Sequence, residues 1–386
     1  MLNMRQHWSL DPGLTFLNHG SFGACPRVVL DHQANLRARL EASPVQFMLQ
    51  VPAELERLRF AVAPFVGAAP EDLAFVRNAT EGVNAVLRSL SFGPKDELLT
   101  SNHVYPGCLN ALRFIAQQSG ASLRVVDVPF PIESPEQVVE AFRSGITSRT
   151  RIALVDHVTS VTGLVFPVAS IAELLRSRGV ACLVDGAHAA GMLDLDIGAL
   201  GVDYYATNFH KWACAPKGAG VLWVRPELQA QIHPSVVSHG YSEPTPRRFQ
   251  AMFDWTGTSD PTAWMCIAKA ISFMGGLVHG GWPKLRAENR RLALHARDLL
   301  CKTLDVPPPA PDTMIGSMAS IPLPNASLPA AGGPDPLYLE LVRRGFETLV
   351  QPFPERPGRV LRVSAQLYNE PQDYERLAHV LPRLLA

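Results

Sequence analysis

Lys211 is the residue whose surroundings point most directly to chemistry. It lies in NFHKWACAPKG (208–218), between His210 and Trp212, and follows the strand-like run YYAT (204–207). A single lysine is usually a solvated surface charge. Aromatic neighbours would instead desolvate its amine and lower its pKa, as a lysine that forms a Schiff base with a cofactor aldehyde requires.

A carboxylate ends another apolar run. ACLVDG (181–186) places Asp185 at the end of a predicted strand, followed by small residues and His188. A carboxylate at that depth needs a positive partner or several hydrogen-bond donors. Enzymes that use pyridoxal phosphate (PLP) place such an aspartate against the pyridine nitrogen of the cofactor and keep that nitrogen charged. An ordinary helix N-cap is the alternative interpretation of Asp185.

Two more strand ends carry polar or aromatic groups. Ala79 and Thr80 open a helix after the run AFV (74–76), and a helix start offers unpaired N–H groups to a phosphate. His103 and Tyr105 follow another strand, where a ring could stack on a flat cofactor. Taken singly, a common helix cap and buried core side chains explain these residues equally well.

The elements that carry these residues alternate along the chain. Apolar runs are followed by helical segments, which predicts a mainly parallel sheet covered by helices on both faces. In such sheets ligands bind at the carboxyl ends of the strands, so the four strand ends could meet in one pocket. The predicted strands are 74–76, 97–101, 123–128, 151–157 and 181–186, and the predicted helices begin at Thr80 and cover 106–118 and 168–178.

The two ends of the chain differ from this alternating part. We expect an extended N-terminal arm over 1–16, a large domain over 17–255 and a smaller α/β domain over 256–386. Residues 43–67 read as mostly helical, with Pro52 starting a new helix. The remaining predictions are a helical stretch over 262–304 that is broken near Gly275–Gly281, and a proline-rich loop with an edge strand over 305–336.

Composition narrows the class of protein. The 386 residues are 47% hydrophobic and 18% charged, with zero formal net charge, which argues against general binding to nucleic acid or membranes. None of the six cysteines lies in a C-x-x-C pair, so we predict no metal centre. The N-terminus has no apolar leader, and no run of about 18 apolar residues occurs. We therefore expect a soluble, cytoplasmic protein.

Several separate motifs resemble one family. RNATEGVNAV, DHVTSVTGLVFPV, VDGAHAAG, NFHKW, WTGTSDPTAW and LRVSAQLYN are similar to motifs of the class V aminotransferases, which are fold-type I PLP enzymes, and of their isopenicillin N epimerase-like group. The resemblance runs from FLNHGSFGACP (16–26) to LRVSAQLYNEPQDYERLA (361–378). It implies PLP as cofactor and a large domain with a mainly parallel central sheet, followed by a smaller α/β C-terminal domain.

The resemblance also implies a role for residues of each motif. Lys211 would bind the cofactor covalently, Asp185 would pair with the pyridine nitrogen, and His188 would lie near the phenolic oxygen. Tyr105 would stack on the ring; His103 competes for this role because cysteine desulfurases place a histidine there. The other cofactor contacts would come from Ala79, Thr80, Asn208 and His210 at the phosphate and from Thr159 or Ser160 at the phenolic oxygen.

Further implied roles concern substrate and assembly. Arg362 resembles the arginine that grips a substrate α-carboxylate, a task suited to a guanidinium fork. Asn18 and His19 would line the substrate entrance. Gly257 and Thr258 resemble a segment that reaches the phosphate of a neighbouring subunit, which implies a homodimer.

The reaction is less determined than the cofactor. A carbanion at the α-carbon of an amino acid, with the freed Lys211 as general base, leads to epimerisation, C–S β-elimination or transamination. We favour the first two, with Tyr105 as a candidate second acid for epimerisation. A cysteine desulfurase is disfavoured because residues 305–386 contain no cysteine. A catalytically idle PLP-fold binding protein remains the hypothesis of another class, whereas a dehydrogenase lacks its G-x-G-x-x-G fingerprint.

Overall fold

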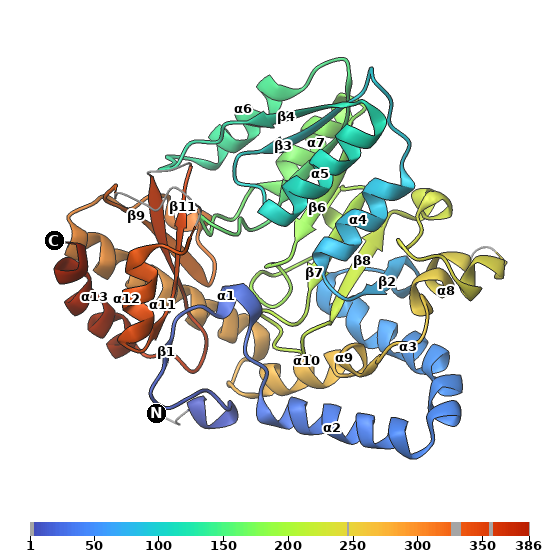
Figure 1. Ribbon diagram of the computed structural model, residues 1–386, viewed down its shortest axis with the longest axis horizontal. Coiled ribbons are helices and arrows are strands. Elements are labelled where there is room, and N and C mark those ends of the chain that lie inside the picture. Colours follow the sequence, from blue (N-terminus) through green and yellow to red (C-terminus); the bar gives the residue numbers. More distant parts are fainter. Residues whose placement is uncertain (1–3, 245–246, 326–332, 355–357, 386) are drawn as a thin grey trace.

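A seven-stranded sheet forms the centre of the protein. The computed structural model describes residues 4–244, 247–325, 333–354 and 358–385 (Figure 1). The strand order is β2-β8-β7-β6-β5-β3-β4. Only β8 pairs antiparallel with its neighbours, so the other six strands run in one direction. The strands are β2 (Leu73–Val76), β3 (Glu97–Ser101), β4 (Ser122–Val126), β5 (Thr150–Asp156), β6 (Ala181–Gly186), β7 (Tyr204–Asn208) and β8 (Gly220–Val224).

Helices cover both faces of this sheet, as predicted. Tyr204 and Tyr205 are successive residues of β7, and their side chains join two separate hydrophobic clusters. One cluster includes α4 (Ala79–Ser89) and α5 (Pro106–Ser119), and the other includes α6 (Pro135–Gly145) and α7 (Val168–Ser177). The mainly parallel α/β architecture is therefore confirmed, and α6 is a helix that the sequence did not reveal.

The N-terminal part differs from the prediction in two places. The arm is not simply extended, because a short 3-10 helix (Met4–His7) precedes the buried Trp8, whose Nε1 donates to the Ala24 carbonyl; residues 1–3 lie outside the described residues. Pro52 does not start a new helix but lies inside α3 (Pro44–Val66). Buried side chains at helical spacing on both sides of Pro52 hold α3 together, so packing outweighs the lost backbone hydrogen bond.

Six further α-helices among the described residues precede residue 305, and the last of them packs mainly against the C-terminal part of the chain. They are α1 (His19–Phe22), α2 (Arg27–Ala42), α8 (Arg248–Asp254), α9 (Thr262–Met265), α10 (Ile267–Gly276) and α11 (Gly281–Leu304). The predicted break near Gly275–Gly281 separates α10 from α11. Because α9 and α10 pack against α2 and α3, a domain boundary at residue 255 stays a prediction.

A second, three-stranded sheet lies in the C-terminal part (Figure 1). It is antiparallel, with the order β11 (Leu349–Pro352), β12 (Arg359–Ser364), β9 (Met318–Leu323). β9 is the predicted edge strand of 305–336, of which 326–332 lie outside the described residues. Helices α11, α12 (Pro336–Arg343) and α13 (Pro371–Leu385) pack on this part of the chain. A short parallel pair, β1 (Thr15–Phe16) with β10 (Phe346–Glu347), joins the N-terminal segment to it.

The length and hydropathy of the helices show whether any of them could span a membrane. Within the described ranges, no helix is both long and apolar enough to cross a bilayer.

Candidate active site

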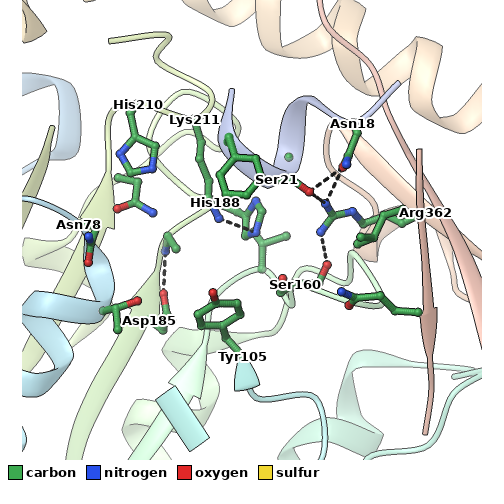
Figure 2. Close-up of a pocket in the computed structure, with 18 of the residues that line it drawn as sticks. Asn18, Ser21, Asn78, Tyr105, Ser160, Asp185, His188, His210, Lys211 and Arg362 are labelled. Carbon is green, nitrogen blue, oxygen red and sulfur yellow. Dashed lines mark hydrogen bonds between the residues drawn. The ribbon is translucent and has the colours of Figure 1, made fainter. Parts of the chain in front are cut away.

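One cavity of about 760 Å³ opens at the carboxyl ends of the parallel strands. The segments after β2, β3, β5, β6 and β7 all reach it, and the N-terminal segment and the three-stranded sheet close its other side. Figure 2 shows residues from these elements pointing into a common space. The predicted site residues among those that line it are Asn18, Thr80, Tyr105, Ser160, Asp185, His188, Asn208, His210, Lys211 and Arg362.

Lys211 enters this cavity from the loop that follows β7. Its Nζ lies 3.1 Å from Nε2 of His188. Burial of the amine lowers its pKa from 10.5 to about 8, and the nearby Asp185 carboxylate opposes that effect without cancelling it. A substantial fraction of the amine is therefore neutral, and hence nucleophilic, near physiological pH.

Capture of an aldehyde by the apoprotein should therefore follow this pKa. Only the neutral amine attacks, so the rate constant for binding PLP should rise about tenfold per pH unit below pH 8 and level off above it. Stopped-flow absorbance after mixing apoprotein with PLP measures this rate. A midpoint near that of an ordinary exposed lysine would contradict the buried environment.

The tautomer of His188 follows from Trp212. Trp212 Nε1, which can only donate, is 3.2 Å from Nδ1 of His188. Burial and the adjacent Lys211 ammonium hold the pKa of His188 well below its usual value, so the ring is neutral. Nδ1 is then the acceptor and Nε2 carries the hydrogen. The Nε2–H of His188 can thus donate to the neutral form of the Lys211 amine, or to an oxygen bound in its place.

Asp185 is the last but one residue of β6 and is almost fully buried. Its Oδ1 accepts a hydrogen bond of 2.9 Å from the Ala187 amide, and its Oδ2 accepts one of 3.1 Å from the Cys108 thiol. Both donors hold the carboxylate in one orientation toward the cavity. A positively charged ring nitrogen would be a suitable partner at this position.

The N-terminal segment packs against the loop that carries Lys211. A Cβ on Gly23 would lie 2.2 Å from the His210 carbonyl, and the φ of Gly23 is +71°, so only glycine fits this contact. His19 is fully buried there, and its Nε2 bonds the Lys211 carbonyl at 3.0 Å while its Nδ1 bonds the Tyr368 hydroxyl at 2.7 Å. His19 therefore positions Lys211 and does not line the cavity, which differs from the expectation for the entrance.

The start of α4 forms another wall of the cavity. Thr80 lines it, whereas the Ala79 amide donates to Asn208 Oδ1 at 2.8 Å. Asn208 therefore accepts from the first amide of α4, whose N-cap is Asn78, and lines the cavity at the same time. Burial lowers the pKa of His210 to about 4, so this ring is neutral here, with Nδ1 3.3 Å from the Ala219 carbonyl. Bound phosphate would raise that pKa and favour protonation of His210.

Tyr105 and His103 lie in different environments. The Tyr105 ring is 42% exposed and lines the cavity (Figure 2). His103 is buried outside it, 4.5 Å between ring centroids from Phe353, and its Nδ1 bonds Thr162 at 2.6 Å. Thr159 bonds the same Thr162 hydroxyl at 2.7 Å. Neither His103 nor Thr159 reaches the cavity, so of the paired candidates only Tyr105 and Ser160 line it.

Arg362 lies on β12, on the side of the cavity that the three-stranded sheet forms (Figure 2). Its Nη2 donates to Asn18 Oδ1 and Ser21 Oγ, each at 3.0 Å, and its Nη1 donates to the Ser160 carbonyl. Its Nε is buried without a partner among the described residues. Burial lowers its pKa to about 10, so the guanidinium stays charged at neutral pH. An unpaired donor on a buried cation suits a carboxylate ligand.

Two further predicted site residues lie outside the cavity, and three residues at the site were not predicted from the sequence. Gly257 and Thr258 follow α8 and do not line this cavity, so a contact through a neighbouring subunit stays a prediction. Ser21, Cys108 and Asp156 were not predicted. The sequence contains a pattern that could have identified Asp156, because LVDH (154–157) ends a strand in the same way as LVDG (183–186).

Comparison with known proteins agrees with this geometry. A family model described as aminotransferase class-V matches residues 23–323. The chain belongs to the class V aminotransferase family. It is 36% identical to isopenicillin N epimerase of Amycolatopsis lactamdurans, over 99% of this chain and 98% of that protein. It is 28% identical to a probable chloroplastic L-cysteine desulfhydrase of Arabidopsis thaliana, over 97% of this chain and 84% of that protein.

A solved structure shares the fold. The mutant of C-DES with glycine covalently linked to its PLP cofactor has a TM-score of 0.79 and 22% identity, and the match covers 99% of this chain and 98% of that one. The protein is thus a PLP-dependent enzyme of fold type I. The residues present fit the cofactor, since one cavity holds a buried amine of lowered pKa, a buried carboxylate and a helix start.

Proposed function

We propose that this enzyme breaks and forms bonds at the α-carbon of an amino acid or an amino-acid derivative, with PLP held on Lys211. The observation that carries this proposal is the presence of Lys211, Asp185 and Arg362 in one cavity. Bound PLP supplies an electron sink for a bond broken at the α-carbon. The roles of the protein groups follow from their positions and charges.

Arg362 orients the substrate. Asn18, Ser21 and the Ser160 carbonyl hold its guanidinium in place, and its buried Nε has no partner among the described residues, which supports a carboxylate as the ligand of this cation. Fixing the α-carboxylate decides which bond of the α-carbon is aligned for cleavage.

Lys211 acts as the base that removes the proton from the α-carbon of the substrate. Its lowered pKa of about 8 suits a general base near neutral pH. Tyr105 enters the cavity from a different element, and burial raises the pKa of its hydroxyl, so it remains a proton donor at neutral pH. This placement supports Tyr105 both as the residue that covers the ring and as the second acid that epimerisation needs.

Epimerisation and C–S β-elimination are the two favoured outcomes. Relatives named isopenicillin N epimerase and L-cysteine desulfhydrase support one each. Transamination is the alternative within the family. A desulfurase is disfavoured because no cysteine lies between 305 and 386, and an idle binding protein is disfavoured by the intact set of Lys211, Asp185 and Arg362.

Product analysis with L-amino acids and cysteine conjugates separates these outcomes. Loss of α-deuterium without a keto acid indicates epimerisation, whereas release of pyruvate indicates β-elimination. Continued formation of a keto acid that depends on a second keto acid as the amino-group acceptor would support transamination instead. Protein that stays colourless after addition of PLP would support the idle binding protein.

The proposal extends to assembly and location. Gly257 and Thr258 would bind the phosphate of a second subunit, so the active unit would be a homodimer, which light scattering can measure. The domains would be 17–255 and 256–386, preceded by the arm. All six cysteines are free and buried, which is typical of a reducing compartment and supports a cytoplasmic location.

A further inference from the structure

Asp156 is a second acid beside Asp185 that no step above uses. It is the last residue of β5, and Asp185, the last but one of the neighbouring β6, pairs with it in parallel register. Adjacent strands lie about 4.8 Å apart, and residues in register point to the same face, so the two carboxyls are neighbours. Each residue is only 3% exposed, and both line the cavity.

The hydrogen bonds of the two carboxyls differ. Both oxygens of Asp185 accept a hydrogen bond, from Ala187 and Cys108. Asp156 Oδ1 accepts one from the Tyr105 amide at 3.3 Å, but Asp156 Oδ2 is buried with no partner among the described residues. An ionised carboxylate oxygen that is left unpaired at this depth is costly. A protonated Asp156 Oδ2 could instead donate a hydrogen bond to the neighbouring Asp185 carboxylate.

The charges around Asp156 favour the protonated form. Asp185 faces it from β6, Tyr105 and Cys108 from the start of α5, and Lys211 from the loop after β7. Burial and then Asp185 raise the pKa of Asp156 well above its usual value, although hydrogen bonds from the backbone amides of Tyr105 and Asp156, and then the Lys211 charge, oppose the shift. The following residue, His157, bonds the Tyr205 hydroxyl at 2.6 Å. Two close buried carboxylates do not both ionise readily.

We propose that Asp156 and Asp185 hold one proton between them, so that the site facing the ring nitrogen carries a single negative charge. Asp156 carries this proton and acts as a positioning residue for Asp185. One negative charge balances the single positive charge of a protonated ring nitrogen. Two carboxylates would leave a buried excess of charge.

The apoprotein of Asp156→Asn tests this without any turnover. Asparagine keeps the shape but never ionises. A carboxyl whose pKa is raised in the folded state loses stability as the pH rises from the unfolded toward the folded pKa. The melting temperature of the variant should therefore rise relative to the wild type as the pH increases above about 4, the ordinary pKa of an aspartate. The exposed Asp127→Asn control should show a constant difference from the wild type over this range.

A difference between Asp156→Asn and the wild type that does not change with pH would overturn the proposal. If that variant does not fold, Asp156→Ser, which is also uncharged, should show the same trend. Infrared spectra give a second readout: the band of a protonated carboxylic acid should be weaker in the variant than in the wild type. Loss of carboxylate bands alone would also overturn the proposal.

Cofactor affinity adds a test that rests on the proposed role of Asp185. Because the charge of the pair stays the same, Asp156→Asn should bind PLP within about threefold of the wild type at neutral pH, a small effect in free energy. Weakening by tenfold or more would show that Asp156 is ionised when the cofactor is bound. The apoprotein measurements stand on their own if the role of Asp185 fails.

Discussion

Replacing Lys211 with alanine is expected to give a protein without the visible absorbance of a covalently held cofactor and without turnover. The buried amine is the group placed to capture the aldehyde and to act as general base. Loss of a general base alone typically costs about 10²–10⁴-fold in rate, and the loss of covalent attachment adds to it. Absorbance spectra with added PLP and a steady-state assay measure both effects.

Lys217 provides the matched control. It lines the same cavity, but its Nζ donates to the Gly23 carbonyl at 2.8 Å. Lys217→Ala should keep the absorbance of the bound cofactor. If Lys211→Ala kept both colour and turnover, the assignment would be wrong, and loss of colour in Lys217→Ala alone would identify Lys217 as the attachment site.

Replacing Arg362 with alanine should mainly weaken binding of the amino acid. A charge-assisted fork on a carboxylate is worth about 2–4 kcal/mol, which corresponds to a loss of about 30–1,000-fold in kcat/KM. The expected pattern is a spectrum of bound cofactor like that of the wild type, with amino-acid titrations shifted to higher concentration. The spectral titration measures affinity directly.

Two further variants separate binding from folding. Arg362→Lys keeps the charge but loses the fork, so its affinity should lie between those of the wild type and the alanine variant. Ser21→Ala removes one hydrogen bond to Arg362 and should have a small effect. Unchanged amino-acid affinity in Arg362→Ala would show that the carboxylate is held elsewhere.

The sequence predicted most of the large sheet well because its central strands are buried on both faces. The predicted strands ELLTS and ACLVDG match β3 and β6 residue for residue. Local pattern failed where packing decides the outcome. Pro52 is tolerated because α3 buries side chains on both sides of it, and the arm forms a 3-10 helix because Trp8 is buried near Ala24.

The site was predictable as a set of strand ends, but not in its details. Because Asp185 and Lys211 lie at or just after the carboxyl ends of two parallel strands, they meet at one edge of the sheet. The sequence did not distinguish His103 from Tyr105, because the two lie only two residues apart. Contacts with residues distant in the chain hold the His103 ring away from the cavity: packing against Phe353 and a hydrogen bond to Thr162. The burial of His19 depends on Tyr368 in the same way.

Reduction with borohydride tests the central claim most directly. The treatment fixes a cofactor held through an imine, and peptide mapping by mass spectrometry then locates it. The account predicts a pyridoxyl group on Lys211, in the peptide that also contains His210 and Trp212. A pyridoxyl group on another lysine, or none in protein that binds PLP, would contradict the account.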